Sequence, residues 1–348
     1  MAFEFLQAQA SEWAAVRQFL IASFNANAET SAFRPEVLQW KYFSPHPEWK
    51  DSRSFLIGNS AAILAHGGVW PVCFITPAAE IKAINLIDWA ASPSVPGIGV
   101  LLLRKVAAMT DAMLAIGGSE HTQQILPKLG YQRRGELRWY AKVIRPWQQY
   151  QTTPSHNWKA PLRLCRNVMW SKQVVQRPPR RWRAEKVAAF ATSMEDAIIR
   201  PRTTSFISCR RTISGLNHLL QCPAGRFSAF LLLEGECVRG YFLICQVGGQ
   251  ARVADIWVNE AQPESWHAAC SLAAATAAED PATCEIVAAS SIDVSSEGFV
   301  RAGFRLRRRD PLNCYDPHAC LDSAHPLNVN LVDGDLCFLN DPSFPYLT

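Results

Sequence analysis

The chain has 348 residues, a length that suits two domains of ordinary size better than one large domain. Hydrophobic residues at 49% and charged residues at 19% indicate a globular protein with a well-filled core and exclude a disordered chain. The net charge of +5 is modest, but it is unevenly distributed along the chain.

The amino-terminal part predicts a mixed series of helices and strands. We place its longer helices at 13–24, 35–43 and 99–110. We place its strands at 54–57, 61–70, 81–91, 113–116 and 131–144, the last as one bent strand or a pair. A further helix should begin at the cap Ser119 and end near Pro127, because proline removes a backbone donor.

Three stretches of the first half recur in the second half in the same order. FLIGNSAAILAHGGVW, IKAINLIDWAASP and ILPKLGYQRRGEL correspond to FLLLEGECVRGYFLICQ, ARVADIWVNEAQP and FVRAGFRLRRRDP. Each set predicts a hairpin, a third strand that carries an aspartate, and a helix that ends at a Gly-aromatic pair. We therefore predict one α/β unit present twice, with domains at 1–145 and 187–348 and a connector at 146–186.

The connector is basic and rich in tryptophan. Between Arg145 and Lys186 stand ten basic residues and one acidic residue, interleaved with four tryptophans. Such a stretch could bind nucleic acid, a membrane surface or an anionic polymer. We favour the simpler interpretation, a connector whose long side chains lie along the two domains, and expect no nucleic-acid partner.

Neither a secretion signal nor a membrane span is predicted. The amino terminus lacks a basic start followed by an apolar core, and the longest apolar run, 61–75, is too short to cross a bilayer. We therefore expect a cytoplasmic protein. The 11 cysteines include no Cys-x-x-Cys pair, so they are interpreted as small buried residues and no metal site is predicted.

The order hairpin, long strand, glycine turn, helix, short strand, helix and Leu-Gly-Tyr resembles the GNAT family of acetyl-CoA-dependent N-acyltransferases. The resemblance covers 1 to about 145, and 187–348 as a fainter copy. Tandem GNAT units also occur in FemABX peptidyltransferases and N-myristoyltransferases, so the duplication does not select a substrate. QWKYFSPHPEW and IGGSEHTQQILPKLGY are similar to acetyltransferase-like proteins of bacterial exopolysaccharide clusters. The resemblance implies acetyl-CoA as cosubstrate and a small-molecule amine as acceptor, with an amino sugar as one candidate.

The phosphate motif of the GNAT family falls on Ser94, Gly97 and Gly99. Glycines let the backbone approach a pyrophosphate, and amides at a helix start point toward the anion. The resemblance therefore implies a cofactor site at Ser94, Gly97, Ile98, Gly99 and Val100, although Ser94 replaces the usual long donor. A tight turn without a ligand is the competing interpretation.

The second unit departs from this motif. Its equivalent loop, 259–266, has no glycine and carries two carboxylates, which would repel a pyrophosphate. We therefore expect the second domain to be degenerate and the first alone to hold acetyl-CoA.

Acyl transfer to an amine requires a group that accepts the amine's proton. Asp88, on the long strand, is the first candidate, and Glu120 and His121 are the alternatives. Because Asp255 occupies a similar place in the degenerate half, a structural role shared by the two aspartates competes with catalysis. His66 is expected to be a satisfied core histidine.

The resemblance also implies an oxyanion donor and an acid. The donor would be a backbone N–H at Trp89 or Ala90. Leu126 stands where many GNAT enzymes have a tyrosine that protonates the leaving thiolate, and nothing in the sequence places Tyr131 or Tyr140 there.

An N-acyltransferase is therefore the leading hypothesis. A non-catalytic GNAT scaffold that binds acyl-CoA or a partner is the first alternative, and a FemABX-like transferase that uses aminoacyl-tRNA is the second. The acceptor, the acyl chain length and the oligomeric state are not predicted.

Overall fold

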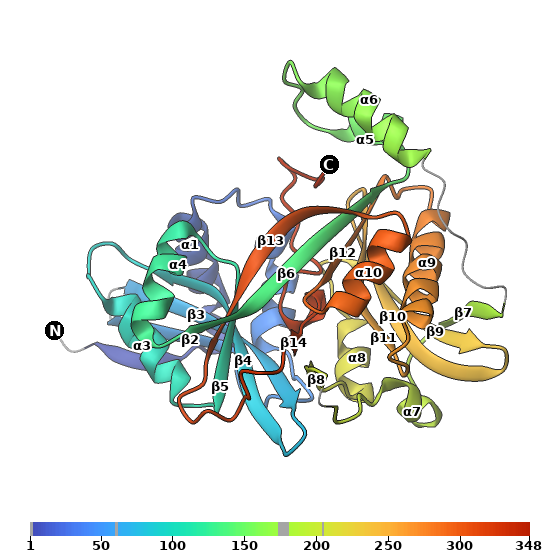
Figure 1. Ribbon diagram of the computed structural model, residues 1–348. Helices are drawn as coiled ribbons and strands as arrows, with labels where there is room; N and C mark the ends of the chain where they lie inside the picture. Colours follow the sequence, from blue (N-terminus) through green and yellow to red (C-terminus); the bar gives the residue numbers. More distant parts are fainter. Residues whose placement is uncertain (1–2, 60–61, 173–180, 204) are drawn as a thin grey trace.

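The computed structural model describes residues 3–59, 62–172, 181–203 and 205–348. Its two halves lie side by side, and the long strands β6 and β13 cross between them (Figure 1). The described strands belong to one continuous sheet.

The first half supplies the strands at one end of this sheet. They are β1 (Glu4–Gln7), β2 (Ser54–Asn59), β3 (Ala62–Ile75), β4 (Glu80–Ala91), β5 (Ala112–Ile116) and β6 (Gln132–Val143). Its α-helices are α1 (Trp13–Phe24), α2 (Pro35–Leu38), which continues as a π-helical turn over Gln39–Phe43, α3 (Ile98–Ala107) and α4 (Glu120–Ile125). Short 3-10 turns lie at Ala10–Glu12, Ser31–Phe33 and Leu126–Leu129.

The second half repeats the pattern. Its strands are β7 (Trp182–Val187), β8 (Ile207–Cys209), β9 (Arg226–Glu234), β10 (Cys237–Val247), β11 (Gln250–Val258), β12 (Glu285–Ser290), β13 (Arg305–Tyr315) and β14 (Leu327–Asn328). Its α-helices are α7 (Glu195–Ile198), α8 (Ile213–Leu219), α9 (Pro263–Glu279) and α10 (Asp293–Arg301), with 3-10 turns at Thr192–Met194 and Leu331–Asp333. Between the two halves in the sequence, the chain forms a helical hairpin of α5 (Pro146–Thr152) and α6 (Ala160–Ser171).

The strand order confirms the predicted repeat and adds an exchange. The order is β1-β2-β3-β4-β5-β13-β6-β12-β11-β10-β9-β7, so each half mirrors the other about the β13–β6 pair. A long strand of each half pairs antiparallel with a short strand of the other half, β13 with β5 and β6 with β12. Neither half of the sheet is therefore complete without a strand from the other.

Turn residues set the ends of several elements. Ser119 accepts a hydrogen bond from the Thr122 amide and so caps α4, as predicted. Gly130 and Gly303 each have φ of +87°, the left-handed conformation that glycine adopts without a Cβ clash. Gly130 lies just before β6 and Gly303 just before β13. The predicted helix ends at Gly-aromatic pairs are therefore left-handed glycine turns.

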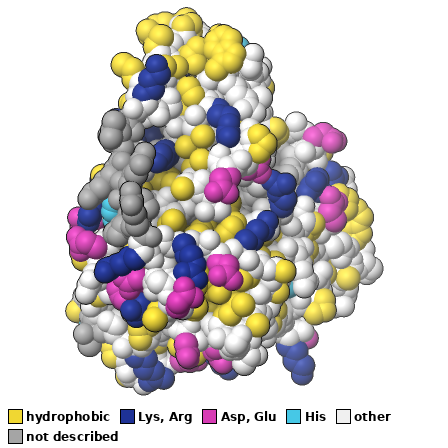
Figure 2. All heavy atoms as spheres, turned by 90° about the vertical axis from the view of Figure 1, so that its right-hand side faces the viewer, with side chains coloured by type: hydrophobic (Ala, Val, Ile, Leu, Met, Phe, Trp, Pro, Cys, Tyr) yellow, Lys and Arg dark blue, Asp and Glu magenta, His cyan; other side chains and the backbone are white. Residues whose placement is uncertain are grey.

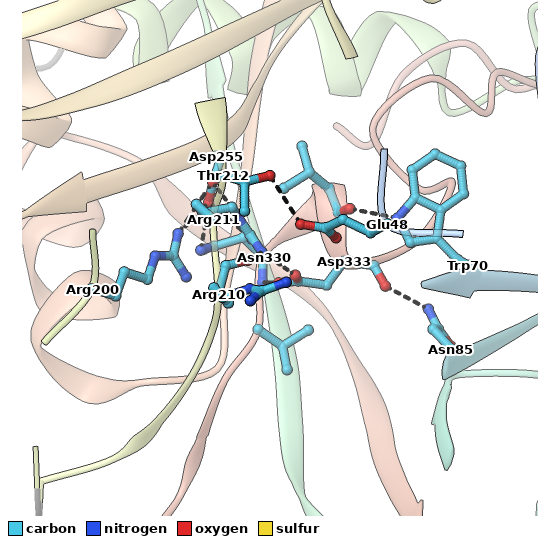
Figure 3. Close-up of polar contacts among 12 residues, drawn as sticks. Glu48, Trp70, Asn85, Arg200, Arg210, Arg211, Thr212, Asp255, Asn330 and Asp333 are labelled. Atoms are coloured by element: carbon cyan, nitrogen blue, oxygen red, sulfur yellow. Dashed lines mark hydrogen bonds and ion pairs between the residues drawn. The ribbon is translucent and has the colours of Figure 1, made fainter. Parts of the chain in front are cut away.

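The carboxyl-terminal segment after β14 is buried between the two halves. The indole of Trp70 donates to the carbonyl of Val332 at 2.9 Å, and the Asn85 amide donates to the carbonyl of Asp333 at 2.9 Å (Figure 3). On the other side, Arg211 contacts the Asp333 carboxylate at 2.7 Å. Because both halves bond to this segment, it can bring side chains into a site of the first half.

None of the described helices is long and apolar enough to cross a membrane.

Candidate active site

A cleft opens where β4 and β5 separate. The two parallel strands pair only from Ala83 with Ala112 to Asn85 with Leu114, although β4 continues to Ala91. Beyond that point a cavity of about 840 Å³ is lined by both strands, the glycine turn, the start of α4 and the carboxyl-terminal segment. Backbone groups of β4 that face β5 along this stretch have no partner in that strand, so they are available to a ligand.

A bulge turns the wall of this cleft at Asp88. The register between β3 and β4 shifts between His66 and Gly68, and Asp88 has φ of +48°, which is uncommon for a residue with a side chain. His66 Nδ1 lies 2.9 Å from the backbone oxygen of Asp88, and its Nε2 lies 3.1 Å from Ser54 Oγ. Burial lowers the pKa of His66 to about 4, so the ring is neutral and satisfied, as predicted.

The two glycines of the turn serve different purposes. Gly97 has φ of +81°, and a Cβ built on it would meet no atom within 4 Å. A Cβ on Gly99 would lie 2.9 Å from the Cβ of Ala91, so Gly99 is needed for close packing of α3 on β4. Gly97 thus supplies the left-handed backbone conformation of the turn and leaves open space where a side chain would stand.

The amides at the start of α3 are largely free. The Ile98 amide bonds to the carbonyl of Val95 at 3.3 Å, whereas the amides of Gly97, Gly99 and Val100 have no hydrogen-bond acceptor within the described residues. The first turn of α3 contains no acidic residue. Three amides and the positive end of the helix dipole therefore form an environment that suits an anion.

Two carboxylates share one buried lysine beside the bulge. The Lys41 ammonium, 1% exposed, contacts the carboxylates of Asp88 and Asp335, and the Tyr42 hydroxyl donates to Asp88. Burial alone would lower the pKa of Lys41, but Asp335 and Asp88 raise it above its ordinary value. The lysine is therefore charged and fixed between the two acids.

The pKa values of the two acids are shifted in opposite directions. Burial opposes ionisation of Asp88, yet the Lys41 charge and the Lys41 and Tyr42 hydrogen bonds hold the pKa of Asp88 below its usual value. Burial raises the pKa of Asp335, Lys41 opposes that rise, and the Asp88 charge adds to it. Environments that push two carboxyl pKa values apart are typical of sites that handle protons.

The second half has a similar but more completely neutralised aspartate. Asp255 on β11 is fully buried and accepts a hydrogen bond from Tyr241. It also accepts hydrogen bonds from Arg200, Arg211 and Asn330 (Figure 3). Its pKa falls to about 2, because the two guanidinium groups outweigh the effect of burial. The aspartates on β4 and β11 thus both neutralise buried cations.

Most of the predicted site residues border the cleft. Those that line the cavity are Asp88, Trp89, Ala90, Gly97, Gly99, Val100 and His121. Three others do not line it. Ser94 is exposed and bonds to the Ser92 hydroxyl at 2.7 Å, Ile98 is buried in the core below the turn, and Glu120 is exposed on the first turn of α4.

Neither Tyr131 nor Tyr140 takes the place of the missing acid. Leu126 is fully buried and lines the cavity. The Tyr131 hydroxyl lies 3.6 Å from the sulfur of Met113 in the core, and the Tyr140 ring stacks on Phe299 at 5.9 Å between centroids. Neither tyrosine therefore lines the cavity.

The equivalent position of the second half is occupied by protein groups. The Trp266 indole donates to the carbonyl of Glu260 at 3.0 Å, and Ser265 Oγ donates to the Glu260 carboxylate at 2.6 Å. The amides of Ser265 and Trp266 both bond to the carbonyl of Gln262. This helix start therefore has fewer free donors than α3 and carries a carboxylate beside it.

Sequence reasoning missed Lys41, Tyr42 and Asp335. Lys41 stands within the aromatic run Trp40 to Phe43, and Asp335 lies in the apolar run Leu331 to Leu339. Charges inside otherwise apolar runs, here Lys41 in one and Asp333 with Asp335 in the other, signal buried, paired groups. The partners of Lys41 could not be found in this way. Asp88 lies 47 residues and Asp335 lies 294 residues from Lys41 in the sequence, and only the fold brings them together.

Comparisons with solved structures agree on the fold. A GCN5-related N-acetyltransferase from Anabaena variabilis aligns over 92% of this chain and 74% of its own, at 10% identity and a TM-score of 0.59. Saccharomyces cerevisiae N-myristoyltransferase with bound myristoyl-CoA aligns over 90% of this chain and 82% of its own, at 10% identity and a TM-score of 0.59. A tandem GNAT protein from the clavulanic acid biosynthesis pathway aligns over 90% of this chain and 98% of its own, at 9% identity and a TM-score of 0.55.

The chain therefore has the tandem GNAT fold that its sequence predicts. No protein-family model and no curated protein sequence matches it. The narrower resemblance to exopolysaccharide-cluster proteins is not supported by these matches. At such low identities the likeness extends to the fold alone.

Proposed function

We propose that this protein transfers an acyl group from an acyl-CoA to a small-molecule amine in the cleft between β4 and β5. The observation that carries the proposal is the set of free amides at Gly97, Gly99 and Val100 beside a cavity of about 840 Å³. The structural neighbours include N-acetyltransferases and an N-myristoyltransferase.

The donor would bind at the glycine turn. Open space at Gly97 lets a pyrophosphate approach the backbone, and the three amides and the α3 dipole stabilise its charge. A bound acyl-CoA would supply the acyl group as a thioester, with acetyl as the group expected from the sequence. The β4 backbone at Trp89 and Ala90, next to the bulge, would stabilise charge on the acyl oxygen.

Asp335 is the best-placed proton acceptor. It lines the cavity, its raised pKa makes it a stronger base than Asp88, and Lys41 fixes its position. In the reaction the amine nitrogen forms a bond to the acyl carbon and the carbon–sulfur bond breaks. The amine's proton passes to Asp335, and the thiolate takes a proton from water. Asp88 then serves mainly to hold Lys41 and the bulge, and His121 and Glu120 remain the other candidates.

The acceptor enters from the side of the carboxyl-terminal segment in this proposal. Asp335, Leu336 and Leu339 line the cavity together with Phe24 from α1, so an amine with an apolar portion would find both charge and apolar contacts. The amino sugar suggested by the sequence is one member of the panel to be tested.

Turnover tests this proposal. Release of free thiol from acetyl-CoA and longer acyl-CoAs is measured with amino sugars, polyamines and aromatic amines as acceptors. The proposal predicts acyl-dependent thiol release that requires an amine and is lost in Asp335→Asn. If the folded protein binds acyl-CoA but releases no thiol with any amine, the second candidate holds: a non-catalytic acyl-CoA-binding scaffold, which the buried Leu126 favours.

A further inference from the structure

The α5–α6 hairpin projects from the body of the molecule (Figure 1). It is tied to the body by polar contacts. The Asn167 amide donates to Gln149 at 3.0 Å, and the Gln149 amide donates to Thr348 Oγ1 at 2.7 Å. Arg145, just before α5, donates to three carbonyls at the end of α9 and beyond. A polar residue, Asn167, is therefore buried on the inner side of α6.

The outer side of α6 is apolar. Leu162 is 64% exposed and Met169 is 67% exposed, and with the exposed Cys165 they lie three and four residues apart, on one face of the helix. Trp158 just before α6 is 79% exposed. Figure 2 shows hydrophobic side chains gathered on this lobe, with Lys and Arg side chains beside them. This distribution is the reverse of an ordinary surface helix, which buries its apolar side.

Cations flank this apolar face without acidic partners. Within the described residues no carboxylate forms an ion pair with Lys159, Arg163, Arg166 or Lys172. Three guanidinium groups lie over the ring of Trp170, those of Arg166, Arg305 and Arg307, at 4.3, 4.7 and 5.4 Å from its centroid.

We propose that the α5–α6 hairpin docks onto an anionic lipid bilayer, with the apolar face of α6 in the interfacial region and the flanking cations against lipid phosphates. Exposed tryptophan, aliphatic side chains and flanking Lys and Arg are the combination that helices lying in a membrane interface use. The docking is peripheral and independent of the chemistry in the cleft.

Two other occupants fit these observations less well. A symmetric pair of chains joined through this face would bring the cations of both copies together, since such an interface contacts itself. A nucleic acid would satisfy the cations but would leave Leu162 and Met169 against a polar, charged backbone. An anionic bilayer satisfies the charges and the apolar face together.

Sedimentation with vesicles tests the proposal. The full-length protein is mixed with phosphatidylcholine vesicles, with or without about one-third phosphatidylglycerol, and the bound fraction is measured at rising salt. We expect binding to the anionic vesicles that weakens with salt and is at least several-fold lower on neutral ones. Leu162→Ser with Met169→Ser should lower the partition coefficient roughly tenfold or more. Arg163→Glu with Lys172→Glu should lower it by a similar factor, since each cation contributes about fivefold.

Matched variants separate this surface from general effects. Val238→Ser with Val300→Ser removes exposed apolar side chains elsewhere, and Lys105→Glu with Lys128→Glu reverses exposed cations of the first half. Both controls should bind vesicles like the unaltered protein. The proposal is overturned if the folded protein does not bind anionic vesicles, or if the controls lose as much binding as the test variants. It is also overturned if the protein does not bind vesicles but forms a dimer, or binds nucleic acid, through this face, so that the test variants abolish the dimer or the nucleic-acid binding.

Discussion

Replacement of Asp255 by Asn should strongly destabilise the fold. Asp255 is fully buried and neutralises Arg200 and Arg211, whose side chains are 0% and 9% exposed. Arg211 would keep Asp333, but Arg200 would lose its carboxylate partner (Figure 3). Removal of one member of a buried ion pair leaves an uncompensated charge and typically costs about 3–5 kcal/mol.

The pKa of Asp255 gives a second measure of the effect. Its fall from 3.8 to about 2 corresponds to about 2 kcal/mol of stability at neutral pH. Because the pKa in the folded state is depressed, this contribution is complete above about pH 4 and is lost as the pH falls toward 2. The acid limb of the stability profile should therefore flatten in Asp255→Asn.

Urea denaturation at neutral pH and along an acid series is the assay. Two variants serve as comparisons. Glu236→Gln removes an exposed pair with Arg183 and should cost less than about 1 kcal/mol. Asp88→Asn leaves Lys41 paired with Asp335 and should cost less than Asp255→Asn. A loss below about 1 kcal/mol in Asp255→Asn would refute the view that the buried Arg200 depends on this carboxylate for its neutralisation.

Three further predictions concern the cleft. Asp335→Asn should not lower the free energy of unfolding at neutral pH. The pKa of Asp335 is raised in the folded state, so ionisation of this carboxyl above pH 3.8 opposes folding. A loss of more than about 1 kcal/mol of unfolding free energy, measured by urea denaturation, would contradict this. Turnover should rise with pH as Asp335 loses its proton, and Asp88→Asn should move that rise to lower pH, because Asp88 helps to raise the pKa of Asp335. An unshifted pH profile would count against Asp335 as the base. Gly99→Ala should lower stability by about 1–3 kcal/mol, because the new methyl group overpacks against Ala91. Gly97→Ala should lower it by about 1 kcal/mol through backbone strain. Thermal melting of the two variants measures both losses.

The repeat and the glycine turn could be predicted because they depend on local sequence. Hairpin turns, the cap at Ser119 and the left-handed glycines at Gly97 and Gly130 involve residues close together in the chain. The order of these elements was enough to predict the fold that the structural matches share.

The exchange of β6 and β13 could not be predicted in the same way. A strand has the same alternation of side chains whichever neighbour it pairs with, so periodicity does not distinguish pairing within a half from pairing across halves. The position of Asp335 depends on this exchange, since the carboxyl-terminal segment follows β13 and returns between the halves. The connector was expected to lie along the domains. Arg145 does bond to the second half, but α5 and α6 form a projecting hairpin.

The binding of coenzyme A to the glycine turn is the central claim. Calorimetric titration of acetyl-CoA into the protein should be compared with Gly97→Trp and with Gly235→Trp, a control at another left-handed glycine with open space around its Cβ position. We predict saturable binding to the unaltered protein and to Gly235→Trp, and at least a tenfold weaker affinity in Gly97→Trp, about 1.4 kcal/mol or more. Absence of binding to the unaltered protein, or equal affinity in all three, would contradict the account.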